Sequence, residues 1–337
     1  MISPPMRIAI VGAGAIAGHY ARLMTEDAAR FTLVGVADVD PRAREVFAAA
    51  HPGIDTFATA AELLAAVRPE AALVATPPVS HEAVSTMLLD HGVHVLCEKP
   101  LAIHVPAATR MLHAASQAGR TLMMASKFRY VAAVQEAQRL LHEGVIGDVV
   151  TFDNVFCSRV AMTGRWNAEI HLSGGGVWID AGAHSVDLVR FLIGPVRRVL
   201  VTPARRVQAI HVEDTVRVLM EAGHGAMGVA DLSWSLHKET DVFFAVHGSK
   251  GTLQLGWRTS RYRLADAEEW VTFGEGYDKR RAFAGQLENF AAVVRDLAPP
   301  VIRIDDAVES VRVVEAGYRS LRTGRFASVH LHPGEHA

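Results

Sequence analysis

The residues near the start of the chain constrain its fold more than any other part of the sequence. Residues 7–11 read Arg-Ile-Ala-Ile-Val, a short apolar strand, and residues 12–17 read Gly-Ala-Gly-Ala-Ile-Ala. Gly12 permits a tight turn, Gly14 lets a pyrophosphate approach the backbone, and Ala17 allows the next helix to pack closely on the strand. We interpret this stretch as a strand, a phosphate-binding turn and a helix, the fingerprint of a dinucleotide-binding βα unit.

A second apolar run, residues 31–37, ends at Asp38, about 20 residues after the glycine-rich turn. An acid at this distance accepts hydrogen bonds from the adenosine ribose hydroxyls. Val39 and Asp40 come next, so no arginine directly follows Asp38 to bind a 2′-phosphate. The sequence therefore predicts NAD, and not NADP, as the cofactor. The alternative interpretation is an ordinary strand–helix turn with a solvent-facing Asp38.

The composition narrows the class of protein. The chain has 337 residues, of which 50% are hydrophobic, enough for two domains with sizeable cores. Its 34 Lys and Arg residues nearly balance its 36 Asp and Glu residues, so no nucleic-acid or membrane partner is predicted. No stretch reaches the ~20 apolar residues of a membrane span. Cys97 and Cys157 make no disulfide framework and lie in apolar runs, which predicts buried thiols in a cytoplasmic protein.

The first third of the chain alternates short apolar runs with helical patterns. This alternation is typical of βαβ units in a parallel sheet. Six strands are expected before residue 127. We therefore predict an α/β protein that begins with a doubly wound Rossmann domain, residues 1–126, and that this domain binds NAD.

The pattern changes after residue 126. Much of 149–157 and 197–273 reads as strands separated by turn residues, and helices are expected near 131–143, 177–193, 280–296 and 305–323. These elements predict a substrate-binding α+β domain, residues 127–337, with an open, largely antiparallel sheet and helices on one face. The other face of such a sheet is often covered by a second subunit. We therefore predict a homodimer or homotetramer formed through this sheet.

Two polar clusters follow buried strands of the first domain. One is Thr76-Pro77-Pro78 and the other is Glu98-Lys99-Pro100. Ligands of doubly wound sheets bind beyond the carboxyl ends of the strands, where both clusters are expected. The Lys99 ammonium is therefore a candidate donor toward developing negative charge. The alternative is a surface lysine beside Glu98.

A third cluster lies in the second domain. Gly174-Gly175-Gly176 precedes a predicted helix on which Asp180, His184 and Asp187 are spaced i, i+4 and i+7, so they share one face. Flanking carboxylates orient an imidazole and favour its protonated form, which suits proton exchange near neutral pH. A metal site is a competing interpretation, but no His-Glu-x-x-His pattern supports it and no metal is predicted. A second competing interpretation is a structural histidine in a salt bridge. Of the three residues, Asp187 is the one most expected to have a purely structural role.

In order and spacing these motifs resemble the Gfo/Idh/MocA oxidoreductases, named for glucose–fructose oxidoreductase, inositol dehydrogenase and a rhizopine-catabolism protein. The resemblance extends over nearly the whole chain. The matching motifs are residues 12–17, Asp38, Thr76-Pro77-Pro78 with His81, Glu98-Lys99-Pro100, Lys127-Phe128-Arg129-Tyr130, the run from Gly174 to Asp187, Gly248-Ser249-Lys250-Gly251 and Gln286-Leu287-Glu288-Asn289-Phe290.

The resemblance implies roles for individual residues. Lys99 matches the lysine that touches substrate and cofactor, His184 the catalytic acid/base, and Asp180 the acid beside it. NAD is expected to contact Gly12, Gly14, Ala15, Ile16, Asp38, Thr76, Pro77, His81, Glu98 and Lys99. The substrate is expected to contact Lys99, Arg129, Tyr130, Arg165, Trp166, Asn167, His171, Asp180 and His184. Lys127 departs from the family, because many members carry a small polar residue there.

The sequence thus predicts an NAD-dependent dehydrogenase that acts on a secondary alcohol of a polyhydroxylated small molecule, such as a sugar, an inositol or a sugar derivative. His184 takes the hydroxyl proton, Lys99 stabilises the alkoxide, and Asp180 orients the imidazole. One alternative is a catalytically silent protein that senses NAD or sugars, although such a binder needs neither Lys99 nor His184. Another is a redox-neutral glycosidase that holds NAD tightly.

Overall fold

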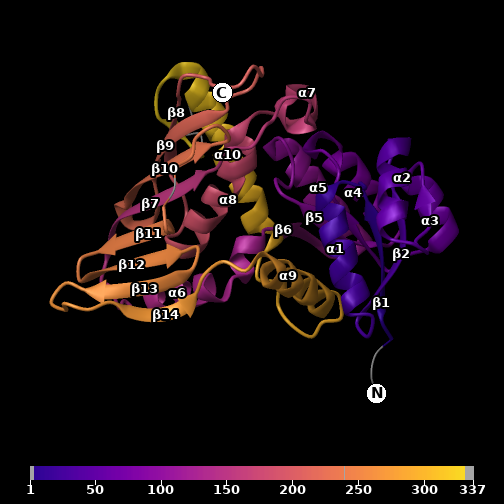
Figure 1. Ribbon diagram of the computed structural model, residues 1–337, viewed down its shortest axis with the longest axis horizontal. Coiled ribbons are helices and arrows are strands. Elements are labelled where there is room, and N and C mark those ends of the chain that lie inside the picture. The colour runs from indigo at the N-terminus through magenta and orange to yellow at the C-terminus, as the bar shows by residue number, and fades with distance from the viewer. Residues whose placement is uncertain (1–3, 239, 331–337) are drawn as a thin grey trace. The chain divides into compact units, whose positions relative to one another are not determined.

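The computed structural model describes residues 4–238 and 240–330, which form two compact units (Figure 1). The first unit comprises residues up to Ala125 together with Phe283–Val308. The second comprises Ser126–Ala282 together with residues from Glu309 onward. The predicted domains, residues 1–126 and 127–337, differ from these units in two places: Ser126 falls in the second unit, and the segment 283–308 belongs to the first.

Helix α9 (Lys279–Val294) explains this difference. It presents Phe283, Leu287 and Phe290, which lie on one face, to the buried cluster that contains Tyr20 and Met24. The side-chain amide of Gln286 also donates a hydrogen bond to the Tyr20 hydroxyl. Burial of this helix face in a distant core decides where the segment belongs, and local sequence pattern does not reveal which core it joins.

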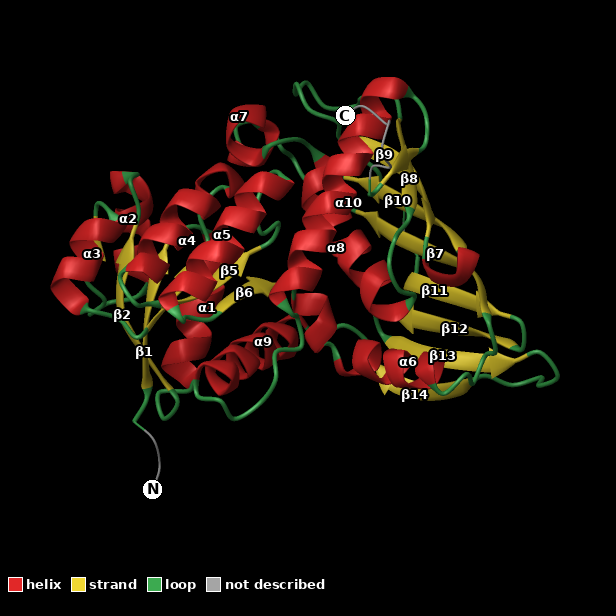
Figure 2. Cartoon of the chain, turned by 180° about the vertical axis from the view of Figure 1, so that it is seen from behind, coloured by secondary structure: helices red, strands yellow, loops and turns green. Residues whose placement is uncertain are grey.

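The first unit is a parallel six-stranded sheet with helices packed against it (Figure 2), which confirms the predicted doubly wound architecture. Its strand order, β3-β2-β1-β4-β5-β6, reverses between β1 and β4, where ligands of such sheets bind. The strands are β1 (Met6–Val11), β2 (Phe31–Ala37), β3 (Thr56–Phe57), β4 (Ala71–Val74), β5 (His94–Glu98) and β6 (Leu122–Ala125). The helices are α1 (Ala15–Glu26), α2 (Pro41–Ala50), α3 (Ala60–Val67), η1 (Pro78–Ser80), α4 (His81–Asp90) and α5 (Val105–Ala118).

The second unit is built on a nine-stranded sheet in the order β14-β13-β12-β11-β7-β10-β9-β8-β15. All neighbours are antiparallel except β7 and β10, so the predicted largely antiparallel sheet is confirmed. The strands are β7 (Val149–Cys157), β8 (Arg198–Pro203), β9 (Thr215–Glu221), β10 (Met227–Ser233), β11 (Val242–Gly248), β12 (Gly251–Gly256), β13 (Thr259–Leu264), β14 (Val271–Glu275) and β15 (Ala327–Ser328). The remaining elements are η2 (Lys127–Tyr130), α6 (Ala132–His142), η3 (Trp166–Ala168), α7 (Ile170–Ser173), α8 (Val177–Leu192), η4 (Gly223–Gly225) and α10 (Ile304–Thr323).

Helices α6, α8 and α10 lie along one face of this sheet (Figure 2). The hydroxyl of Ser185 on α8 donates a hydrogen bond to the side chain of Asn154 on β7, so even-numbered positions of β7 face α8. No helix of the described residues covers the opposite face in the same way. That face carries polar groups, among them the cross-strand pair Arg217–Asp231, whose Nε and Oδ1 atoms are 2.7 Å apart.

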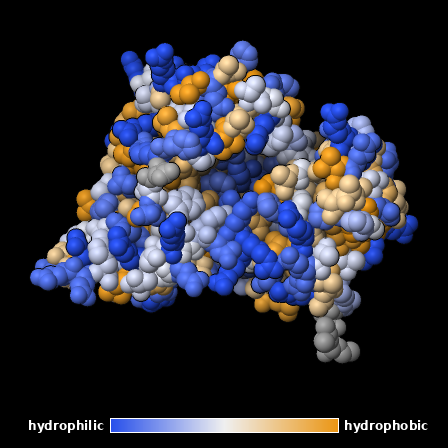
Figure 3. All heavy atoms as spheres, viewed as in Figure 1, coloured by the Kyte–Doolittle hydropathy of each residue, from blue (hydrophilic) through white to orange (hydrophobic). Residues whose placement is uncertain are grey.

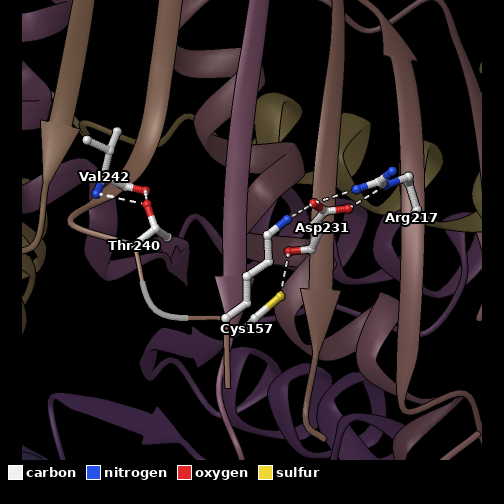
Figure 4. Close-up of polar contacts among 6 residues, drawn as sticks. Cys157, Arg217, Asp231, Thr240 and Val242 are labelled. Atoms are coloured by element: carbon white, nitrogen blue, oxygen red, sulfur yellow. Dashed lines mark hydrogen bonds and ion pairs between the residues drawn. The ribbon is translucent and has the colours of Figure 1, made fainter. Parts of the chain in front are cut away.

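The two cysteines differ in environment. Cys97 is fully buried in β5, as predicted, and burial raises the pKa of its thiol. Cys157 is only half-buried on the face of the sheet opposite α8, so the prediction of a buried thiol is wrong there. Its Sγ donates to the carbonyl oxygen of Asp231 at 3.4 Å, beside Arg217 (Figure 4). Partial burial still raises the pKa of the Cys157 thiol to about 11, so it is a weak nucleophile at neutral pH.

Hydrophilic and hydrophobic residues are interspersed on the face of the molecule seen in Figure 3. Such mixing is ordinary for a globular surface, because apolar atoms still contribute much of it. Among the helices of the described residues, none is both long and apolar enough to cross a membrane.

Candidate active site

The glycine-rich turn has the geometry that a pyrophosphate site requires. Gly12 has a φ of +100°, and a Cβ on it would lie 2.5 Å from the carbonyl oxygen of Ala75 on the neighbouring segment. Only glycine fits both the conformation and the space. Gly14 is exposed and caps α1, and a Cβ there would meet nothing within 4 Å. The free N–H groups at the start of α1 therefore lie beneath an open surface that an anion can approach.

Asp38 is held at the end of β2 by two backbone groups. Its Oδ2 accepts a hydrogen bond from the N–H of Ala13 at 2.7 Å, and its Oδ1 accepts one from the N–H of Asp40 at 2.9 Å. Each oxygen keeps a lone pair for a ribose hydroxyl. An arginine does lie nearby in space, because Arg44 on α2 donates to the carbonyl oxygen of Asp38 at 2.6 Å. That guanidinium contacts the backbone and supports the turn.

His81 joins the segments that follow β4 and β5. Its ring is 1% exposed, with Nδ1 2.9 Å from the carbonyl oxygen of Pro100 and Nε2 2.9 Å from that of Thr76. Burial lowers the pKa of His81. The predicted contact of His81 with NAD is therefore corrected: the ring is buried between two loops, and in its neutral form it donates a hydrogen bond to one of the two carbonyl oxygens.

The residues around it keep their places at the sheet edge. Glu98 and Lys99 are half-buried at the end of β5. Glu98 accepts hydrogen bonds from the N–H of Lys99 at 3.1 Å and from the hydroxyl of Tyr20 at 3.5 Å. Thr76 accepts one from the hydroxyl of Ser80 at 2.8 Å. The predicted cofactor residues thus follow β1, β2, β4 and β5 at one edge, and this edge fits a dinucleotide.

In the second unit, Glu213 holds the N-terminus of α8. Its Oε1 accepts hydrogen bonds from the N–H groups of Gly176 at 3.0 Å and Trp178 at 3.2 Å, and from the hydroxyl of Tyr318 at 3.0 Å. Its carbonyl oxygen accepts from the N–H of Val177 at 2.8 Å. Burial raises the pKa of Glu213. A carboxylate thus satisfies backbone donors that begin a helix with no side-chain cap of its own.

This cap explains two of the three consecutive glycines, and backbone conformation explains the other. A Cβ on Gly175 would overlap the hydroxyl of Tyr318, and one on Gly176 would overlap the carbonyl oxygen of Glu213. Gly174 has a φ of +81° where α7 ends. The sequence analysis missed Glu213 and Tyr318, because they are far from the glycines in sequence and no local motif marks them.

Asp180 and His184 lie in the first two turns of α8, and both are half-buried. The Oδ2 of Asp180 accepts a hydrogen bond from the indole N–H of Trp234 at 3.1 Å. The imidazole of His184 meets the ring of Phe128 edge-on, with centroids 5.2 Å apart. Asp180 and His184 therefore lie on one side of α8, as predicted. Trp234, directly after β10, fixes the Asp180 carboxylate by its hydrogen bond.

Asp187 has a different role. It is fully buried, and its Oδ1 lies 2.6 Å from Nη2 and 2.9 Å from Nε of Arg129, while its Oδ2 accepts from the hydroxyl of Ser126 at 2.5 Å. Arg129 is 3% exposed and Tyr130 is also buried. The predicted substrate contact of Arg129 is therefore corrected, because its guanidinium is buried in an ion pair with Asp187 of α8.

The other predicted substrate residues follow β7. The segment leaves the sheet beside β10, where the N–H of Ser158 donates to the carbonyl oxygen of Ser233 at 2.9 Å. The residues of this segment that are predicted to contact substrate are Arg165, Trp166, Asn167 and His171. They are largely exposed, and 41% of the Trp166 surface is accessible. Their contact with substrate stays a prediction.

Within 4–238 and 240–330, no group of three His, Cys, Asp or Glu side chains is arranged to hold a metal ion. The competing metal interpretation of the cluster on α8 needed Asp187 as a ligand. That carboxylate is already occupied by Arg129 and Ser126.

Comparison with known proteins identifies both parts of the chain. Residues 6–126 match the model described as oxidoreductase family, NAD-binding Rossmann fold, and residues 134–254 match that of the GFO/IDH/MocA C-terminal domain. The first unit is therefore an NAD-binding Rossmann domain, which confirms the predicted cofactor.

Individual relatives extend the match. A putative UDP-kanosamine synthase oxidoreductase subunit of Amycolatopsis mediterranei is 30% identical over 272 residues, covering 74% of this chain and 75% of the relative. A D-apiose dehydrogenase of Paraburkholderia graminis is 28% identical over 291 residues, covering 80% and 75%. Among solved structures, GenD2 from gentamicin A biosynthesis, in complex with NAD, is 27% identical, with a TM-score of 0.85 and 98% of each chain covered.

The buried pair Arg129–Asp187 generates a test of stability. We expect Asp187→Leu to lower the free energy of unfolding by about 3–5 kcal/mol, because it removes the carboxylate that balances the charge of a buried guanidinium. The double variant Arg129→Met, Asp187→Leu should recover most of that loss, because it leaves neither charge buried alone. Urea denaturation followed by circular dichroism measures both. Equal losses in the two variants would show that packing, and not the unpaired charge, sets the cost.

Proposed function

The chain belongs to the Gfo/Idh/MocA oxidoreductase family, and from that premise we propose that it is an NAD-dependent dehydrogenase of a secondary alcohol in a sugar, an inositol or a sugar derivative. The observation that carries the proposal is the pair Asp180–His184 on the capped start of α8, together with Lys99 at the end of β5. A protein that only bound NAD would need none of these three side chains. The sugar class is supported by the name of the related D-apiose dehydrogenase.

Each residue has a defined task in this proposal. NAD, when bound, supplies the hydride acceptor. Asp38 would accept hydrogen bonds from the ribose hydroxyls, and the N–H groups at the start of α1 would donate hydrogen bonds to the pyrophosphate. His184 removes the proton from the substrate hydroxyl oxygen, and the Lys99 ammonium stabilises the negative charge that develops there. Asp180, itself fixed by Trp234, supplies negative charge one turn before the imidazole and stabilises the imidazolium that forms when His184 takes the proton.

Specificity for polyhydroxylated compounds is assigned to side chains that donate and accept hydrogen bonds. The segment after β7 supplies Arg165, Asn167 and His171, and Trp166 offers a face to an apolar side of a sugar ring. A screen of sugars, inositols and sugar acids for NADH fluorescence tests the activity directly. Reduction of added NAD supports the proposal. Cofactor that copurifies and never exchanges would favour the redox-neutral glycosidase instead.

We also propose that the chain acts in the cytoplasm as a homodimer or homotetramer through the face of the nine-stranded sheet opposite α8. On that face, strand positions such as Val155 of β7 are only half-buried, and a wide open sheet gains by being covered. Sedimentation velocity of the purified chain should give two or four times the monomer mass of 36.4 kDa. A monomer at micromolar concentration would contradict this assembly.

The first catalytic prediction concerns the choice of cofactor. Because the Asp38 carboxylate is fixed by Ala13 and Asp40, it should repel a 2′-phosphate. Repulsion of about 1.4 kcal/mol corresponds to a tenfold preference, so kcat/KM should favour NAD by about tenfold or more. Asp38→Ser with Val39→Arg should move the preference toward NADP. Equal kcat/KM with the two cofactors in the wild type would show that Asp38 does not face the ribose.

The second prediction separates chemistry from cofactor binding. Lys99→Ala and His184→Ala should each lower kcat by ~10²–10⁴-fold, because each removes a group that acts on the reacting oxygen. Both should still bind NAD in calorimetry, because the expected pyrophosphate and ribose contacts lie elsewhere, whereas Asp38→Ala serves as the control that weakens NAD binding. Near-normal kcat in His184→Ala would assign the base to another residue. Loss of NAD binding in both variants would place these residues in the cofactor site.

A further inference from the structure

Six aromatic rings of the second unit meet at one end of the nine-stranded sheet, and His184 is one of them. The others come from Phe128 in η2, Phe156 near the end of β7, Phe243 near the start of β11, Trp257 after β12 and Tyr277 after β14. Because neighbouring strands pair Val242 with Gly256 and Thr259 with Glu275, these positions share one end of the sheet.

Five of these rings form a closed circuit. From His184 the centroid distances are 5.2 Å to Phe128, then 5.1 Å to Tyr277, 5.7 Å to Trp257, 6.2 Å to Phe156, and 6.5 Å back to His184. Each spacing lies within the range of interacting rings. The proposed base is therefore one member of a continuous aromatic surface.

Packing accounts for only part of this cluster. Phe243 and Phe128 are 1% and 4% exposed and form its floor. Trp257 is 38% exposed, and Phe156, Tyr277 and His184 are half-buried. Tryptophan side chains are largely buried on average. The exposure of Trp257, which is continuous with a candidate base, therefore needs an explanation other than packing.

Trp257 is exposed on a well-held turn. Its N–H donates to the carbonyl oxygen of Asp241 at 2.9 Å, and its carbonyl oxygen accepts from the N–H of Tyr277 at 3.2 Å. A Cβ on Gly276 would overlap that same carbonyl group, so the glycine is required for the two turns to touch. The indole is therefore presented in a defined position, which lowers the ordering cost of binding a ligand.

The same surface carries polar groups. The hydroxyl oxygen of Tyr277 is itself buried, so the ring of Tyr277, and not its oxygen, is the part available to a ligand. The ammonium of Lys127 lies 5.4 Å from the centroids of both Phe128 and Tyr277. A ligand that stacks here can thus place a hydroxyl or another electron-rich group against the wall.

We propose that Phe156, Trp257 and Tyr277 form a stacking wall beside His184, and that this wall selects six-membered ring substrates, pyranoses or cyclitols, over open-chain polyols. The C–H groups on one side of such a ring make a flat apolar face that suits an indole, while its hydroxyls remain at the edge. An open-chain polyol has no lasting flat face and loses more torsional freedom on binding. This inference rests on the dehydrogenase function proposed above.

The test compares Trp257→Ala with the matched control Trp270→Ala. Trp270 is half-buried on another hairpin, with the guanidinium carbons of Arg261 and Arg263 4.4 Å and 5.1 Å from its ring centroid. Wild-type kcat/KM should be about tenfold or more higher for methyl glucopyranoside or myo-inositol than for sorbitol. Trp257→Ala should raise KM for the ring substrate about tenfold, with little change in kcat or in KM for NAD. Trp257→Phe should fall between, and Trp270→Ala should behave as the wild type.

The outcomes distinguish this inference from the function on which it rests. Wild-type KM for ring substrates in both Trp257→Ala and Trp257→Phe would overturn the wall, as would equal efficiency with sorbitol. If Trp257→Ala does not fold, Trp257→Phe carries the test. If the wild type oxidises no polyhydroxylated compound, the dehydrogenase proposal fails. Quenching of tryptophan fluorescence by the same ring compounds then tests the wall alone: quenching lost in Trp257→Phe supports it, and absence of quenching in the wild type overturns it.

Discussion

The rest of the candidate active site depends on one set of hydrogen bonds, those that the carboxylate of Glu213 accepts at the start of α8. This carboxylate accepts two backbone N–H groups and the hydroxyl of Tyr318, and so defines where α8 begins. Asp180 and His184 lie within the next two turns, so the same cap determines their position. The glycines before α8 have no chemistry of their own. Gly175 and Gly176 are required because Tyr318 and Glu213 occupy the space that their side chains would need.

The first unit uses the same device, a polar side chain that orders the backbone near a candidate binding surface. His81 lies between the carbonyl groups of Thr76 and Pro100, and Asp38 accepts from the N–H groups of Ala13 and Asp40. In each case a side chain adjacent in space satisfies polar groups that neither a helix nor a strand pairs. Loops that contact ligands need such support, because regular secondary structure does not hold them.

The aromatic wall and the buried pair Arg129–Asp187 show how residues of one motif divide between tasks. Lys127-Phe128-Arg129-Tyr130 is a single short helix, yet Phe128 touches His184 while Arg129 is buried against Asp187. The aromatic partners of Phe128, namely Phe156, Trp257 and Tyr277, come from strands and turns spread over more than a hundred residues. The residues proposed to set specificity therefore come from the sheet and its turns, whereas Asp180 and the proposed base come from one helix.

Local sequence was sufficient for features that depend on neighbours in the chain. The turn at Gly12, the acid after β2 and the shared face of Asp180 and His184 follow from backbone sterics and helix periodicity, which act over a few residues. Tertiary structure alone decided the cap by Glu213, the burial of Arg129, the place of 283–308 and the ring circuit around His184. Each of these depends on which distant surfaces meet, because burial and close packing are properties of the folded core and leave no periodic trace in the residues that supply them.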